Sequence, residues 1–275
     1  MKDPYPTSPP STLSFLNESK ALLDIATLAP RLVSAALVNN KQGSDLGRSN
    51  YLPVVLLPGF ASDERYLWPL QLFLKSKGIR AEGWGLGLNL AGSNLQHELE
   101  DISEGWNVEP YEGYSPETYK GEGGVPYLCD LATDRILERT EELGGPVTLV
   151  GWSLGGYIAR EVARDLPEQV AHVVTMGSPV IGGPKYTRAA SLFKKKGYNL
   201  DWIESESAKR DAVPIKQPIT SIVSKADGIV DWRAAIDNVS PNVVHHYVKT
   251  QHLGMGFSKE VWQITLDSIR DYGRL

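Results

Sequence analysis

Short apolar runs alternate with amphipathic patterns from residue 52 onward, and this alternation most constrains the fold. The run at 52–57, LPVVLL, ends sharply at Pro58-Gly59 and is apolar on both faces, as a buried parallel strand requires. Apolar residues at helical spacing follow at 63–77. The pattern predicts further strands at 79–84, 147–150, 170–176, 219–223 and 243–248, and further helices at 126–143, 154–165 and 259–270. This order indicates an α/β fold with a mostly parallel central sheet and helices on both faces.

Three parts of the chain stand outside this alternation. Apolar residues recur at helical spacing from Leu22 to Ala36, so we expect 1–49 to form an N-terminal helical extension packed on the core, ending in a polar linker at 39–50. Within the main domain, 50–275, the stretch 93–125 is rich in Gly, Glu and Tyr, and 183–216 has its own helical pattern. Long insertions in compact domains are usually functional, so we expect both to form a small lid or cap.

Composition and charge exclude several classes of function. The net charge of -5 has no sustained basic stretch behind it, which argues against nucleic acid as a partner. The single cysteine, Cys129, excludes an internal disulfide and any cysteine-rich metal site. Neither HExxH, GxxxxGK nor a paired CxxC occurs, so no metal and no cofactor is expected.

The N-terminal region does not resemble a secretory signal or a transmembrane segment. The apolar stretch 21–37 is interrupted by Asp24, Pro30 and Arg31, so it is too short and too broken to span a membrane. We therefore expect a cytoplasmic protein. Peripheral membrane contact through this stretch is the alternative to a helix packed on the protein's own body.

The strongest local motif is Gly151-Trp152-Ser153-Leu154-Gly155. It lies between the predicted strand at 147–150 and the predicted helix at 154–165, the context of a nucleophile elbow. In such a strained turn the serine hydroxyl projects above the sheet, and the residues two positions away on either side must be small. The pattern predicts Ser153 as a nucleophile; the alternative is a glycine-rich turn with a serine helix cap.

A nucleophilic serine needs a base, and in this type of fold the order along the chain is Ser, then Asp or Glu, then His. Of the five histidines, His252 lies in the loop after the predicted strand at 243–248, where parallel sheets collect catalytic groups. His246, inside that strand, is the alternative.

The third member of a triad orients the imidazole. Asp227 follows the predicted strand at 219–223 and precedes Gly228, whose turn freedom suits such a loop. Asp231 is the alternative, and either aspartate could instead be a turn carboxylate or a helix cap before residues 232–236.

An oxyanion hole needs two backbone N–H groups. The N–H of Leu154, directly after the nucleophile, supplies the first. We expect the second from the turn after the first strand, where Phe60 and Ala61 are the candidates.

The motifs LLPGF, GWSLGG, SKADGIV and HLGMG occur in this order over residues 50–275. In these motifs the chain resembles the α/β-hydrolase superfamily, and within it the lid-bearing bacterial esterases and lipases. The resemblance implies a hydrolase reaction and assigns Asp227 and His252 as the partners of Ser153. The first insertion, 93–125, is longer than this family leads us to expect.

Apolar residues near the motifs predict a hydrophobic pocket lined by Phe60, Trp152 and Met255. Leu192 and Phe193, beside three lysines, predict either a lid helix that covers this pocket or a solvated surface helix. The expected activity is hydrolysis of hydrophobic short- to medium-chain esters, from small molecules or lipids, through an acyl-enzyme. Acyl transfer to an alcohol and a non-catalytic ligand-binding homologue are the alternatives, and the sequence does not indicate an oligomeric state.

Overall fold

The computed structural model describes residues 5–19, 21 and 50–274. Residues 12–19 are helical. The helical pattern predicted at 22–36 and the linker predicted up to residue 49 lie outside the described residues. None of the helices within the described ranges is long and apolar enough to cross a membrane.

Within the described residues, six parallel strands form the central sheet, in the order β2-β1-β3-β4-β5-β6. Their bounds are β1 Val54–Leu57, β2 Ala81–Gly83, β3 Val147–Trp152, β4 Val170–Met176, β5 Ile219–Ser224 and β6 Val243–Val248. The predicted strands are therefore all present, with boundaries within two residues. Because β1 pairs with β2 on one side and β3 on the other, the chain reverses its winding direction between β1 and β3. In α/β sheets the crevice at the carboxyl ends of two such strands is the usual place for a site.

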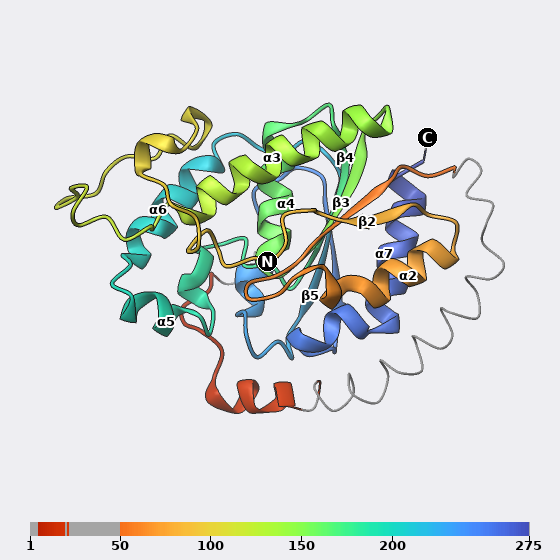
Figure 1. Ribbon diagram of the computed structural model, residues 1–275. Coiled ribbons are helices and arrows are strands. Elements are labelled where there is room, and N and C mark those ends of the chain that lie inside the picture. Colours follow the sequence, from red (N-terminus) through yellow and green to blue (C-terminus); the bar gives the residue numbers. More distant parts are fainter. Residues whose placement is uncertain (1–4, 20, 22–49, 275) are drawn as a thin grey trace.

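Helices cover both faces of the sheet (Figure 1). The helices α3 Gly124–Leu143 and α4 Leu154–Asp165 pack on one face, and α2 Trp68–Ser76 and α7 Lys259–Tyr272 pack on the other. Strand β1 contributes to both: Val55 and Leu57 belong to the first core and Val54 and Leu56 to the second. A strand apolar on both faces is thus explained by two separate cores.

One local expectation needed correction. The helix predicted at 63–77 is a 3-10 turn, η2 Glu64–Leu67, followed by α2, because Pro69 favours the first turn of a new helix. His245 and His246 on β6 are both half-buried. In the part of the chain that the structure describes, β6 is an edge strand and pairs with β5 alone.

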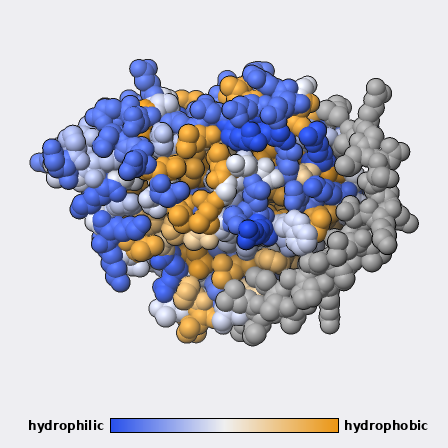
Figure 2. All heavy atoms as spheres, in the orientation of Figure 1, coloured by the Kyte–Doolittle hydropathy of each residue, from blue (hydrophilic) through white to orange (hydrophobic). Residues whose placement is uncertain are grey.

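The insertions lie together at one end of the sheet. Residues 93–125 contain two short 3-10 turns, η3 Leu99–Asp101 and η4 Glu104–Trp106, while the second insertion contains η5 Gly183–Tyr186, α5 Ala190–Lys195 and α6 Leu200–Arg210. The indole N–H of Trp202 donates to the Glu109 carbonyl at 3.0 Å, which joins the two insertions. Hydrophilic side chains follow the upper and left margins of this view, with apolar side chains gathered nearer its middle (Figure 2).

Candidate active site

Ser153 forms a one-residue turn between a strand and a helix. β3 ends at Trp152 and α4 begins at Leu154, so Ser153 alone makes the connection. Its φ of 55° and ψ of -125° are strained values for a residue with a side chain. The packed strand and helix on either side hold this conformation in place.

Two glycines make the turn possible. A Cβ atom on Gly151 would collide with the backbone of Gly155 and Gly156, and one on Gly155 would collide with the carbonyl oxygen of Leu57. The requirement for small residues two positions before and after Ser153 is therefore a steric fact of this fold.

Asp227 and His252 form a buried hydrogen-bonded pair. Asp227 Oδ2 lies 2.7 Å from His252 Nδ1, and both side chains are almost fully buried. Asp227 Oδ1 accepts from the backbone N–H groups of Ile229 and Val230, at 2.9 and 2.8 Å. These bonds fix the carboxylate, which in turn orients the imidazole so that its other nitrogen, Nε2, is left for a substrate or a nucleophile.

The rival residues have other surroundings. Asp231 Oδ1 accepts from the Arg233 N–H at 2.8 Å and caps the short turn η6 Trp232–Ala235, while its carboxylate also pairs with the Arg233 guanidinium. This is the helix-cap role that the sequence left open for either aspartate. His246 lies on the edge strand β6 and does not line the cavity described below.

Hydrogen bonding distinguishes the two candidates for the second oxyanion donor, the backbone N–H groups of Phe60 and Ala61. The N–H of Ala61 donates to the Asn89 carbonyl at 2.7 Å, so it is already used. Over residues 50–274, the N–H groups of Phe60 and Leu154 have no hydrogen-bond acceptor. Buried Asn89 also holds the turn through its side-chain N–H, which donates to the Pro58 carbonyl at 2.8 Å.

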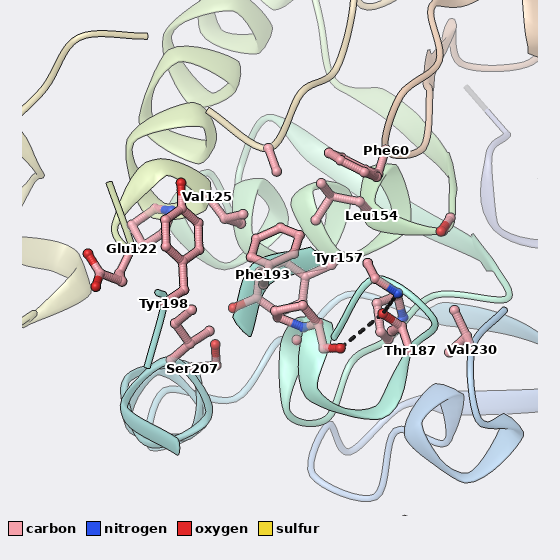
Figure 3. Close-up of a pocket in the computed structure, with 18 of the residues that line it drawn as sticks. Phe60, Glu122, Val125, Leu154, Tyr157, Thr187, Phe193, Tyr198, Ser207 and Val230 are labelled. Atoms are coloured by element: carbon pink, nitrogen blue, oxygen red, sulfur yellow. Dashed lines mark hydrogen bonds between the residues drawn. The ribbon is translucent and has the colours of Figure 1, made fainter. Parts of the chain in front are cut away.

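A cavity of about 260 Å³ opens beside Ser153 and His252. Figure 3 shows Phe60, Leu154 and Phe193 among the side chains that line it. Phe60, Trp152 and Leu154 line it, and both insertions contribute to its walls. From the insertions come Trp106, Val108, Glu122, Val125, Phe193, Tyr198, Trp202 and Ser207. Among the described residues, no hydrogen bond joins the Ser153 hydroxyl to the His252 ring; such bonds are often long until a substrate closes the site.

Two residues expected in the pocket lie elsewhere. Met255 is fully buried in the core between the sheet and the helices α2 and α7. Leu192 is 43% exposed on the outer side of α5. Phe193, the next residue on α5, faces inward and packs on Phe60 with 6.1 Å between the ring centroids. Successive helical positions point about 100° apart, so Leu192 and Phe193 present different sides of α5.

Tyr66 supports the His252 loop, and no local sequence signal pointed to it. Its ring stacks on Trp152 at 3.7 Å, and its hydroxyl donates to the Leu253 carbonyl at 2.9 Å. Burial raises the pKa of the Tyr66 phenol, so the hydroxyl remains a donor. The indole N–H of Trp152 donates to the carbonyl of His252 itself, at 3.2 Å.

Comparison with solved structures identifies the fold of this chain. No family model matches the chain. The esterase Pf2001 of Pyrococcus furiosus is similar with a TM-score of 0.50 and 17% identity, over 83% of this chain and 85% of that one. The lipase BlEst2 of Bacillus licheniformis gives a TM-score of 0.56 at 13% identity, over 81% and 93% of the two chains. The chain has the α/β-hydrolase fold.

A weaker match is found at the level of the sequence. A stretch of 134 residues is 28% identical to chloroplastic pheophytinase of Arabidopsis thaliana. It spans 47% of this chain and only 28% of the length of that relative. Within the α/β-hydrolase fold, the order Ser153, Asp227, His252 is the order in which nucleophile, acid and base occur along the chain.

Proposed function

We propose that this α/β-hydrolase chain is a serine carboxylic-ester hydrolase, with Ser153, Asp227 and His252 as its catalytic triad. The observation that supports this most directly is the 2.7 Å hydrogen bond between Asp227 and His252, because His252 lines the same cavity as Ser153. A strained serine, an oriented imidazole and a buried carboxylate are the three parts that acyl transfer to serine requires.

The reaction would proceed through an acyl-enzyme. Ser153 Oγ attacks the ester carbonyl carbon while His252 Nε2 takes the hydroxyl proton, and Asp227 stabilises the imidazolium that forms. The N–H groups of Phe60 and Leu154 would donate to the oxyanion. Collapse of the tetrahedral intermediate breaks the ester C–O bond, and His252 gives its proton to the departing alcohol. A water molecule then attacks the acyl-enzyme by the same route, which releases the acid and restores Ser153.

The lining of the cavity supports hydrophobic esters of short to medium chain length as substrates. Phe60, Trp152 and Phe193 give it apolar, aromatic walls near Ser153. The lysines that follow Phe193 on α5 face water, as a lid helix over an apolar site requires. The same apolar lining favours acyl transfer to an alcohol as a second activity, because such a site disfavours water.

Turnover of nitrophenyl esters of increasing acyl length tests the proposal. We expect Ser153→Ala to lower kcat at least about 1000-fold relative to the wild type, because both the nucleophile and its covalent intermediate are lost. Ser207→Ala, another serine of the same cavity, is the matched control and should stay within a fewfold of the wild type.

The same assay separates the alternatives. New ester formed after an alcohol is added would indicate acyl transfer. Equal rates for the wild type and Ser153→Ala, together with no labelling of Ser153 by a fluorophosphonate, would reject a serine hydrolase and favour a ligand-binding protein.

A further inference from the structure

A buried carboxylate from the N-terminal segment lies against the two loops that hold Asp227 and His252. Glu18, in the helical residues 12–19, is only 2% exposed. A carboxylate is rarely buried this far unless its oxygens are hydrogen-bonded, because it loses its hydration. Its partners therefore identify what the group does.

Three backbone amides donate to Glu18, and they come from both loops. Oε1 accepts from the N–H of Gly228 at 2.7 Å and from the N–H of His252 at 2.9 Å. Oε2 accepts from the N–H of Leu253 at 2.9 Å. Gly228 directly follows Asp227, so the Glu18 carboxylate joins the backbone of the Asp227 loop to the backbone of the His252 loop. Bonds to a charged acceptor are about twice as strong as bonds between neutral groups.

The helical residues 12–19 pack closely against the Asp227 loop. A Cβ atom on Gly228 would collide with the carbonyl oxygen of Ser14 and lie 3.0 Å from Cγ of Glu18. Gly228, read from the sequence as a source of turn freedom, has an ordinary backbone conformation here. Its small size is what allows residues 12–19 to approach.

We propose that Glu18 is a positioning residue, which holds the Asp227 loop and the His252 loop at the separation that their 2.7 Å hydrogen bond requires. Glu18 does not line the cavity, so it has no access to a substrate in it. Glu18 would therefore affect turnover only by positioning the two loops. This inference rests on the proposed function, in which Asp227 and His252 belong to the catalytic triad. A displacement of about 1 Å in a catalytic group can lower the rate about 100-fold, which makes such a tie consequential.

The same segment also contacts the second insertion. The Tyr5 hydroxyl donates to Glu204 Oε1 at 3.0 Å, and the Arg188 guanidinium lies 4.7 Å from the centre of the Phe15 ring. Arg188 Nη1 donates to the Pro10 carbonyl at 3.3 Å. Residues 5–19 therefore connect the Asp227 and His252 loops to the second insertion. Their helical part, residues 12–19, lies at the lower edge of the molecule in Figure 1.

The test compares full-length Glu18→Ala and Glu18→Gln with the wild type, and uses Leu13→Ala as the matched control. Leu13 belongs to the same helical segment and is 72% exposed. Amide hydrogen exchange is measured at Gly228, His252 and Leu253, with the central strands β3 and β4 as the reference. We expect exchange about tenfold faster at the three amides in the Glu18 variants, no change in the reference strands, and no change in Leu13→Ala.

Kinetics on a nitrophenyl ester give the second measurement. We expect kcat to fall about 10- to 100-fold in both Glu18 variants while KM stays within about threefold, because the cavity is intact and only the alignment is lost. Glu18→Gln keeps the size of the side chain and one acceptor oxygen, so it serves if Glu18→Ala does not fold.

Each outcome decides the inference. Wild-type exchange at the three amides would overturn it, and so would a uniform rise in exchange across β3 and β4, which would indicate a general effect on stability. Faster exchange with an unchanged kcat would also overturn it. If wild-type protein and Ser153→Ala were equally inactive, the proposed function would fail, while the exchange measurement would still decide whether Glu18 ties the loops.

Discussion

At the scale of the residue, Asp227 and Asp231 lie four positions apart on one loop but have different hydrogen-bond partners. The carboxylate of Asp227 is buried and bonded to His252, whereas Asp231 caps η6 and pairs with Arg233. A histidine base needs a carboxylate at Nδ1 to select its tautomer and to stabilise its charge. The hydrogen bonds in the structure therefore show which aspartate contacts the histidine, whereas the sequence only favoured Asp227 over Asp231.

Replacing each aspartate by asparagine tests this distinction. Asp227→Asn should lower kcat on a nitrophenyl ester by about 10,000-fold, because an amide can offer its NH2 group to Nδ1 and favour the wrong tautomer. Asp231→Asn should stay within a fewfold of the wild type, because asparagine also caps helical turns. Similar losses in both variants would contradict the assignment of Asp227.

At the scale of the element, α6 is joined to α4 by a buried ion cluster around Arg210. The guanidinium donates to Glu161 Oε2 at 3.1 Å and to both oxygens of Asp165, at 2.7 and 2.8 Å. It also stacks on Trp106, with Cζ 4.3 Å from the ring centre. One side chain thus links the second insertion to a core helix and to the first insertion.

Removing that guanidinium should destabilise the protein. We expect Arg210→Met to lower the free energy of unfolding by about 3 kcal/mol, because it leaves buried carboxylates with fewer cations. The control is Lys209→Met at the neighbouring position, which breaks a more exposed ion pair with Glu206. It should change the free energy of unfolding by less than about 1 kcal/mol. Urea unfolding of both variants measures the difference, and equal losses would show that the cluster does not stabilise this junction.

At the scale of the whole molecule, a histidine in the centre of the sheet links stability to pH. His172 lies on β4 with no exposed surface, and burial lowers its pKa to about 3. In the unfolded chain the imidazole takes up a proton below its ordinary value of 6.5, but in the folded chain it does not until about 3. The stability that depends on neutral His172 is therefore complete above pH 6.5 and is lost progressively as the pH falls from 6.5 towards 3.

The effect can be measured by urea unfolding at two pH values. His172 should contribute a loss of about 1.4 kcal/mol in the free energy of unfolding between pH 7.5 and 5.5. We expect His172→Phe to remove this part of the pH dependence. Thr220→Val is the matched control, because it removes the 3.1 Å partner of the ring and leaves the imidazole in place. The prediction is wrong if His172→Phe keeps the wild-type slope.

The sequence by itself determined the order of strands and helices and the turn at Ser153. Both follow from features close together in the sequence: continuous apolar runs mark the strands, and the collision that Gly151 avoids is with Gly155 and Gly156 of the same strand–turn–helix unit. Such short-range rules can be read from a few residues. For the same reason the boundaries of α4 and β4 were predicted to the residue.

Only the tertiary structure decided which side chains meet at the site. The Glu18–His252 bond joins positions 234 residues apart, and neither residue's neighbours in the sequence indicate it. Met255 was expected in the pocket and lies in the core, while Phe193 faces the cavity and Leu192 faces water. These outcomes depend on how distant segments pack, and a hydrophobic pattern records that a side chain is buried without recording against what.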